Sequence, residues 1–214
     1  MYIVWCILIG YLIGCLSPSY LVSKIKKIDV RKKGSGNLGA TNVGLVIGKK
    51  WGVAVMIFDI LKAFVAVKLA QYAFSGKVLA GVLAGSCSML GHNHPFYLKF
   101  KGGKGLATFG GLVLALNPLH FVILLGLAVI LAIVFRYGVM LPLTATTLFP
   151  LMTALSHYRM AGNNWVYGLL AFLILVPPSV SILLRHKSNF RRIKEGTEIG
   201  FLEGFRGKRY EEKE

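Results

Sequence analysis

Long apolar stretches separated by short polar segments constrain the fold of this chain more than any other feature. About seven such stretches are present, approximately at residues 2–22, 51–74, 78–90, 105–116, 119–135, 139–157 and 165–184. A transmembrane helix needs about 20 apolar residues, and lipid tolerates no unpaired backbone. The mean hydropathy of +0.64 also excludes an ordinary soluble domain. The sequence therefore predicts an all-α, polytopic membrane helix bundle in a single domain, 1–214, with a mobile tail at 199–214.

The distribution of basic residues predicts the orientation of this bundle. Lysine and arginine are frequent in the segments 24–50, 99–104 and 185–213, whereas Lys77 and Arg159 are the basic residues of the opposite loops. Cytoplasmic loops of membrane proteins carry an excess of Lys and Arg. The N-terminus is thus predicted outside and the C-terminus in the cytoplasm. The net charge of +17 is interpreted as topology signals and contacts with anionic lipid, and nucleic-acid binding is not expected.

Two charged residues, Asp59 and Lys62, fall within the second apolar stretch. Residues three apart share a helix face. Charges at membrane depth are usually paired or functional. The favoured interpretation is an internal ion pair that supports the bundle, and a direct catalytic role is the alternative.

The first polar segment, Gly34-Ser35-Gly36-Asn37-Leu38-Gly39-Ala40-Thr41-Asn42, combines glycines, amides and hydroxyls after a basic run. Glycine lets backbone N–H groups approach a ligand, and successive N–H groups form anion sites. The segment therefore has the composition of a phosphate cradle. A plain polar linker is the alternative. A dinucleotide fingerprint is disfavoured because helical stretches, not strands, flank the glycines.

The second polar segment, 91–108, contains Gly102, Gly103 and Lys104 at the start of a helical stretch. Free N–H groups at a helix N-terminus and a lysine charge both favour a phosphate. A Walker loop is excluded because Leu98 stands where its first glycine should be. His92 and His94 lie two residues apart without a cysteine or carboxylate cluster, so a substrate-contacting or structural role is favoured and no metal site is expected.

The third polar segment, 186–198, directly follows the last apolar stretch. His186, Asn189 and Arg192 are spaced to share one face of a helix. A basic tail that touches anionic headgroups would have the same composition. Because all three polar segments are predicted on the same side of the membrane, a shared anion site is the favoured interpretation.

Together the three segments resemble the motifs of the acyl-phosphate:glycerol-3-phosphate acyltransferase family of bacterial membranes, the PlsY-type enzymes. The first is similar to that family's G-S-G-N-x-G-x-x-N-x-x-R pattern and the second to G-H-x-x-P-x-F/Y…F-K-G-G-K-G-x-A-T. The third is similar to H-x-x-N-x-x-R-x-x-x-G-x-E, through His186, Asn189, Arg192 and Glu198. The sequence departs from the family at Leu45, where the first pattern ends in arginine.

The resemblance implies transfer of a fatty acyl group from acyl phosphate to the sn-1 hydroxyl of glycerol 3-phosphate, giving lysophosphatidic acid and phosphate. It implies a multi-pass enzyme of the bacterial inner membrane, monomeric, embedded in membrane lipid, without a cofactor, whose active site faces the cytoplasm. The expected catalytic residues are Ser35, Lys104 and His186. The expected substrate-binding residues are Gly34, Gly36, Asn37, Asn42, His92, Gly102, Gly103, Asn189, Arg192 and Glu198.

Several alternatives stay open at this point. The proton acceptor is His186, His92 or, as the favoured interpretation, a phosphate oxygen of the substrate. A covalent role for Ser35 is the runner-up because no base adjoins it in the sequence. A transporter or channel for an organic phosphate would share the basic loops, and a non-catalytic lipid-binding paralogue is the third hypothesis.

Overall fold

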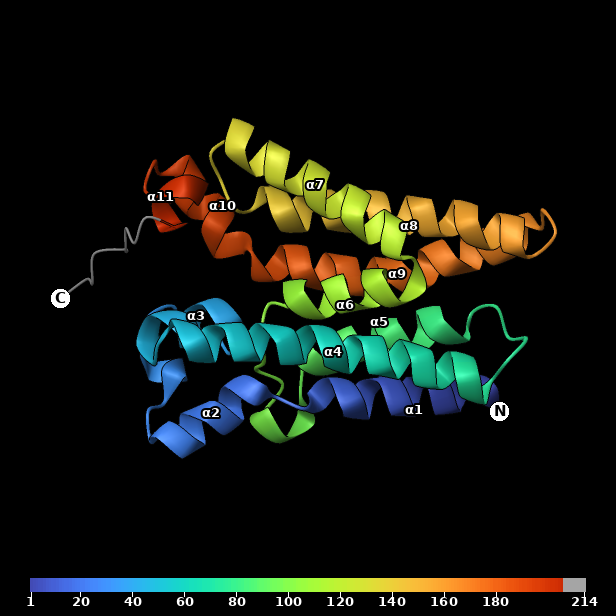
Figure 1. Cartoon of the computed structure of the whole chain (residues 1–214), viewed down its shortest axis with the longest axis horizontal. Helices are drawn as coiled ribbons and strands as arrows, with labels where there is room; N and C mark the ends of the chain where they lie inside the picture. The colour runs from blue at the N-terminus through green and yellow to red at the C-terminus, as the bar shows by residue number, and fades with distance from the viewer. Residues whose placement is uncertain (206–214) are drawn as a thin grey trace.

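The computed structural model describes residues 1–205, and this part of the chain is built from helices (Figure 1). The long helices are α1 (Tyr2–Cys15), α4 (Lys49–Ala73), α5 (Ala80–Asn93), α6 (Leu106–Leu116), α7 (Pro118–Val134), α8 (Met140–Met160) and α9 (Trp165–Arg185). The shorter α-helices are α2 (Pro18–Lys26), α3 (Ala40–Val46), α10 (Lys187–Lys194) and α11 (Phe201–Phe205). Two 3₁₀ turns, η1 (Val30–Lys32) and η2 (Phe96–Leu98), complete the described elements.

The helices α4 to α9 follow the apolar stretches of the sequence to within about three residues at each end. The first stretch differs, because α1 ends at Cys15 and α2 begins at Pro18. Ser17 caps the new helix by accepting a hydrogen bond from the Tyr20 N–H at 3.3 Å, and Pro18 at the first helical position has no N–H to satisfy. The prediction of one uninterrupted helix over 2–22 was therefore wrong.

Small residues let α1 pack closely on α5. A Cβ added at Gly10 would lie 2.2 Å from the Ala84 carbonyl oxygen, and one added at Gly14 would lie 2.0 Å from that of Ser88. Close approach at small residues is a typical way to associate helices in lipid. Any larger side chain at these two glycines would separate α1 from α5.

The surface of the bundle is rich in exposed apolar side chains, such as Leu12 at 54%, Leu119 at 65% and Leu173 at 51%. The segments Tyr2–Lys26 and Trp165–Arg185 are long and apolar enough to cross a membrane, and Leu106–Leu116 and Pro118–Val134 are shorter apolar helices. Exposed apolar surface of this extent indicates contact with lipid.

The polar segments gather at one end of the bundle. In Figure 1 the N-terminus and the α8–α9 turn lie at the right end, whereas α2, α3, α10 and α11 lie at the left end. At that left end, the Phe201 N–H donates to the Arg136 carbonyl at 2.6 Å, which attaches α11 to the α7–α8 turn. The predicted mobility of the tail concerns residues 199–214, of which 206–214 lie outside the described residues.

Candidate functional site

The first loop, residues 33–39, is organised by Asn42, which lies in the first turn of α3 and is 1% exposed. Its oxygen accepts the Ser35 N–H at 2.9 Å, and its amide donates to the carbonyls of Val30 at 2.8 Å and Lys33 at 3.2 Å. Gly34 has a φ of 59°, and a Cβ there would lie 2.4 Å from the Asn42 Oδ1. Asn42 was predicted to contact substrate, but these bonds already occupy both ends of its amide.

Ser35 itself is exposed at the tip of this loop. The neighbouring Gly36 has a φ of 68°, and its N–H donates to the Lys33 carbonyl at 3.1 Å. A left-handed backbone of this kind favours glycine. The Ser35 and Gly36 N–H groups are both engaged within the loop, so neither is free to bind an anion in this conformation.

The second loop, residues 94–105, is fixed on the end of α5 by two backbone hydrogen bonds. The Gly102 N–H donates to the Asn93 carbonyl at 3.0 Å, and the Gly103 N–H donates to the His92 carbonyl at 3.2 Å. A Cβ at Gly103 would lie 2.2 Å from the His92 Nε2 and 2.7 Å from the Leu38 carbonyl oxygen. The absence of a side chain at Gly103 therefore lets the first and second loops lie against each other.

His92 belongs to a buried charged cluster that connects the second loop to the membrane helices. Its Nδ1 lies 3.2 Å from Asp59 Oδ1 and 2.9 Å from Lys62 Nζ, and the latter two atoms are 2.7 Å apart. Lys62 also donates to the Leu16 carbonyl at the break between α1 and α2 at 2.7 Å. The predicted Asp59–Lys62 pair is thus confirmed. His92, at 7% exposure, is placed inside the protein and not at a surface open to substrate.

The third segment joins the second through a chain of polar side chains. Lys104 Nζ donates to Asn189 Oδ1 at 2.7 Å, and Asn189 Nδ2 donates to Glu198 Oε1 at 2.8 Å. Arg192 Nε lies 2.6 Å from Glu198 Oε2. Residues separated by about 85 positions in the sequence are thereby held in one network. The carboxylate of Glu198 orients both Asn189 and Arg192.

Arg185 also belongs to the site region, although no sequence pattern singles it out. It lies at the end of α9, and its guanidinium donates to the Asn93 carbonyl and, at 3.4 Å, to the Gly102 carbonyl. In the sequence it is one of several basic residues after the last apolar stretch, and no spacing distinguishes it. Its contacts attach α9 directly to the backbone of the second loop.

The electrostatics of the loops favour an anion. Burial lowers the pKa of Lys104 below its usual value, and the nearby Arg192 lowers it further while Glu198 opposes the change. Among the described residues, Lys104 and Arg192 place two cationic side chains beside the carboxylate of Glu198. A phosphate group next to Lys104 would be attracted by the charge of this lysine.

His186 is held in its neutral form. Burial lowers its pKa to about 4, and the charge of Lys104 acts in the same direction. Its Nδ1 lies 2.8 Å from the Ile182 carbonyl oxygen. Because a carbonyl only accepts, Nδ1 carries the proton and Nε2 is left as an acceptor. The ring can therefore accept a hydrogen bond from a substrate hydroxyl, but it is a weak base at neutral pH.

Comparison with known proteins gives a consistent result over nearly the whole chain. The family model described as glycerol-3-phosphate acyltransferase matches residues 4–196. A glycerol-3-phosphate acyltransferase of Thermoanaerobacter pseudethanolicus is 36% identical over 199 residues, covering 92% of this chain and 95% of the relative. One of Rhizobium meliloti is 36% identical over 194 residues, covering 90% and 89%.

Two solved structures are also similar to this chain. The glycerol 3-phosphate form of PlsY, an integral membrane glycerol 3-phosphate acyltransferase, superposes with a TM-score of 0.78 at 30% identity and covers 96% of this chain and 99% of that one. Its lysophosphatidic acid form gives a TM-score of 0.74 at 30% identity, covering 94% and 96%. The all-helical architecture and the apolar surface accordingly describe an integral membrane protein. The match of sequence, motifs and fold shows that the chain belongs to the glycerol-3-phosphate acyltransferase family.

Proposed function

We propose that this protein transfers a fatty acyl group to the first hydroxyl of glycerol 3-phosphate, giving lysophosphatidic acid. The observation that carries the proposal is the junction at Lys104. There the second loop contacts the first loop through Gly103 and Leu38, and the third segment through Asn189. The three segments whose motifs match the family thus adjoin at a cationic site.

We propose acyl phosphate as the acyl donor, with inorganic phosphate as the leaving group. The carbonyl of a mixed anhydride is already activated, so the enzyme needs to align it with the acceptor hydroxyl and stabilise the developing charge. Lys104, at the junction of the loops, is suited to balance the negative charge that develops on the carbonyl oxygen of the acyl group and on the departing phosphate. We propose that the hydroxyl of Ser35, an exposed residue of the first loop, donates a hydrogen bond to the phosphate of the donor.

Glycerol 3-phosphate is proposed to bind beside the third segment. Arg192, oriented by Glu198 at 2.6 Å, would contact its phosphate. Asn189 accepts from Lys104 and donates one N–H to Glu198, so it would offer the phosphate the second N–H of its Nδ2. The neutral His186 would accept a hydrogen bond from the reacting hydroxyl through Nε2. Because this imidazole is a weak base at neutral pH, a phosphate oxygen of the substrate is the proposed proton acceptor.

The remaining predicted site residues are proposed to shape the loops. Gly34 and Gly36 provide the left-handed turns of the first loop. Gly103 allows the second loop to contact the first, and Gly102 allows the second loop to lie against the end of α5. Asn42 and His92, being buried and hydrogen-bonded within the protein, are proposed as positioning residues in place of the direct contacts first expected. Asn37, half-buried in the first loop, is retained as a substrate contact.

We further propose a single domain of seven transmembrane helices, α1 and α4 to α9, in the bacterial inner membrane. The N-terminus would lie outside, and the basic end that carries α2, α3 and α10 would face the cytoplasm, in agreement with the positive-inside rule. The protein is proposed to act as a monomer within membrane lipid.

The test is phosphate release from palmitoyl phosphate by the purified protein, with and without glycerol 3-phosphate. Release that requires the acceptor is expected. Lys104→Ala should lower the rate by at least about a hundredfold, because it removes a positive charge that would stabilise the negative charge developing in the transition state. Lys101→Ala, at an exposed lysine of the same loop, is the matched control and should retain activity. Absence of acceptor-dependent release would favour a transporter or a non-catalytic lipid-binding protein.

A further inference from the structure

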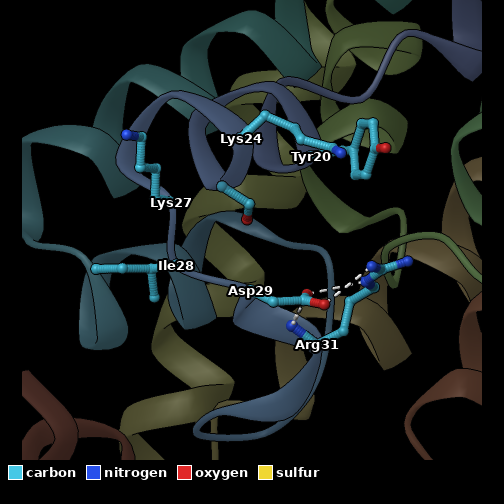
Figure 2. Close-up of a pocket in the computed structure, with 7 residues that line it drawn as sticks. Tyr20, Lys24, Lys27, Ile28, Asp29 and Arg31 are labelled. Atoms are coloured by element: carbon cyan, nitrogen blue, oxygen red, sulfur yellow. Dashed lines mark hydrogen bonds and ion pairs between the residues drawn. The ribbon is translucent and has the colours of Figure 1, made fainter.

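A pocket distinct from the three loops lies between α2 and η1. It has a volume of about 290 Å³, near the lower limit of small-molecule sites. Figure 2 shows Tyr20, Lys24, Lys27, Ile28, Asp29 and Arg31 around it, and Ser23 completes the lining. None of these residues belongs to the acyl-transfer site proposed above.

The charges of this pocket favour an anion. Asp29 is already engaged by Arg31, whose Nε and Nη2 each lie 2.9 Å from its carboxylate oxygens (Figure 2). This pairing holds the pKa of Asp29 at about 2, so the carboxylate is ionised under all physiological conditions. Lys24 and Lys27 have no carboxylate partner in the pocket lining. The lining thus carries more positive than negative charge.

Aromatic and hydroxyl groups add to the pocket in ways that suit a phosphate. The Lys24 Nζ lies 5.6 Å from the centroid of the Tyr20 ring, and the Arg31 guanidinium carbon lies 5.8 Å from it, so the ring restrains both cations. The Ser23 side chain is 7% exposed, and among the described residues its hydroxyl has no hydrogen-bond partner. Leaving a buried hydroxyl unpaired costs about 1–3 kcal/mol, so a ligand that pairs with it would be favoured.

The surroundings of the pocket indicate a lipid as the source of the anion. Leu21 is 60% and Ile25 59% exposed, one turn apart on α2 next to Lys24. Exposed apolar side chains also precede α2 in the chain, with Leu12 of α1 at 54% and Leu16, just after α1, at 52%. A basic helix with an exposed apolar ridge lies in the membrane interface. A phosphate bound in the pocket would therefore be close to acyl chains that cover this ridge.

We propose that the α2–η1 pocket binds the phosphate headgroup of an anionic membrane lipid, with Lys24 and Lys27 balancing its charge and the Ser23 hydroxyl donating a hydrogen bond. The pocket also adjoins the first loop, because η1 contacts both. Asn42 donates to the Val30 carbonyl at 2.8 Å, and a Cβ at Gly36 would lie 3.1 Å from the Arg31 carbonyl oxygen. A bound lipid would thus stabilise the turn on which the first loop rests. This inference does not depend on the proposed acyl transfer.

The experiment is native mass spectrometry of the full-length protein in detergent, titrated with phosphatidylglycerol or phosphatidylcholine. Retention of one phosphatidylglycerol in preference to phosphatidylcholine is expected. Lys24→Gln with Lys27→Gln should weaken it by about fivefold for each lysine. Ser23→Ala, which leaves the charge unchanged, should weaken it about tenfold.

Three controls make the result specific. Lys49→Gln with Lys50→Gln removes the same charge from exposed lysines outside the pocket and should change retention by less than about twofold. Lys104→Ala should retain the lipid, which separates this pocket from the proposed active site. Melting temperatures of all variants show whether each remains folded.

Equal losses in the pocket and Lys49/Lys50 variants would overturn the proposal in favour of a diffuse charge effect. Displacement of the lipid by inorganic phosphate or glycerol 3-phosphate at comparable concentration would also overturn it, because the pocket would then bind a free phosphate. Activity toward palmitoyl phosphate is measured separately, so a failure of the acyl-transfer proposal leaves these outcomes unaffected.

Discussion

Replacement of Asn42 by alanine tests whether this residue contacts substrate or shapes the first loop. The structure gives its side chain three hydrogen bonds, to the Ser35 N–H and to the carbonyls of Val30 and Lys33. At about 1 kcal/mol for each bond, Asn42→Ala should destabilise the loop by about 3 kcal/mol. If the loop opens locally, this corresponds to about a hundredfold faster amide exchange.

Hydrogen exchange followed by mass spectrometry over residues 30–42 measures this effect directly. Asn42→Asp keeps an acceptor for the Ser35 N–H but loses the donor to both carbonyls, so its exchange should be intermediate. Thr41→Ala, at the exposed neighbouring position, is the matched control and should exchange like the parent protein. We expect Asn42→Ala to lower both kcat and the protection of the loop amides from hydrogen exchange. Unchanged exchange with an increase confined to the KM for glycerol 3-phosphate would refute the positioning role and restore a direct contact.

Three further perturbations have expected outcomes. Asp59→Asn should lower stability by about 3–5 kcal/mol because it leaves Lys62 as a buried, uncompensated charge, and Asp59→Asn combined with Lys62→Met should recover much of the melting temperature; no recovery would contradict the pairing. The pKa of His186 in the folded protein is about 4, below its unfolded value of about 6.5, so the protein should lose stability as the pH falls from about 6.5 toward 4. In His186→Gln the melting temperature should vary less with pH over this range. The same pH dependence in this variant would contradict the assignment of a buried, neutral His186. Leu45→Arg should lower the KM for glycerol 3-phosphate by several-fold because a guanidinium binds phosphate in a forked geometry; kinetics with varied acceptor measure this, and an unchanged KM would show that position 45 lies outside the acceptor site.

The apolar stretches determined much of the fold without tertiary information. Hydropathy summed over about 20 residues is a strong signal because lipid permits only helices in which every backbone group is paired. For this reason α4 to α9 could be located to within about three residues. The break after Cys15 was missed because a serine cap and a following proline are short local signals inside an apolar run.

The composition of the polar segments predicted loops suited to an anion, since glycine, amide and basic side chains have this chemistry in any fold. The Asp59–Lys62 pair was also predictable, because residues three apart share a helix face. The hydrogen-bond partners of Asn42 and His92 were not predictable. Both residues stand in motifs where a substrate contact is expected, yet Asn42 bonds to backbone groups and His92 lies beside Asp59 and Lys62.

The sequence by itself therefore determined which segments form apolar helices and which three polar segments make up the candidate site, because hydropathy and residue type act locally. The tertiary structure decided how those segments meet. Lys104 donates a hydrogen bond to Asn189, which lies 85 positions away in the sequence. Arg185 donates to the carbonyl of Gly102, which lies 83 positions away. Contacts of this kind depend on how helices pack. Gly103 can approach the Leu38 carbonyl closely because glycine has no Cβ. No periodicity or spacing along one chain encodes such distances.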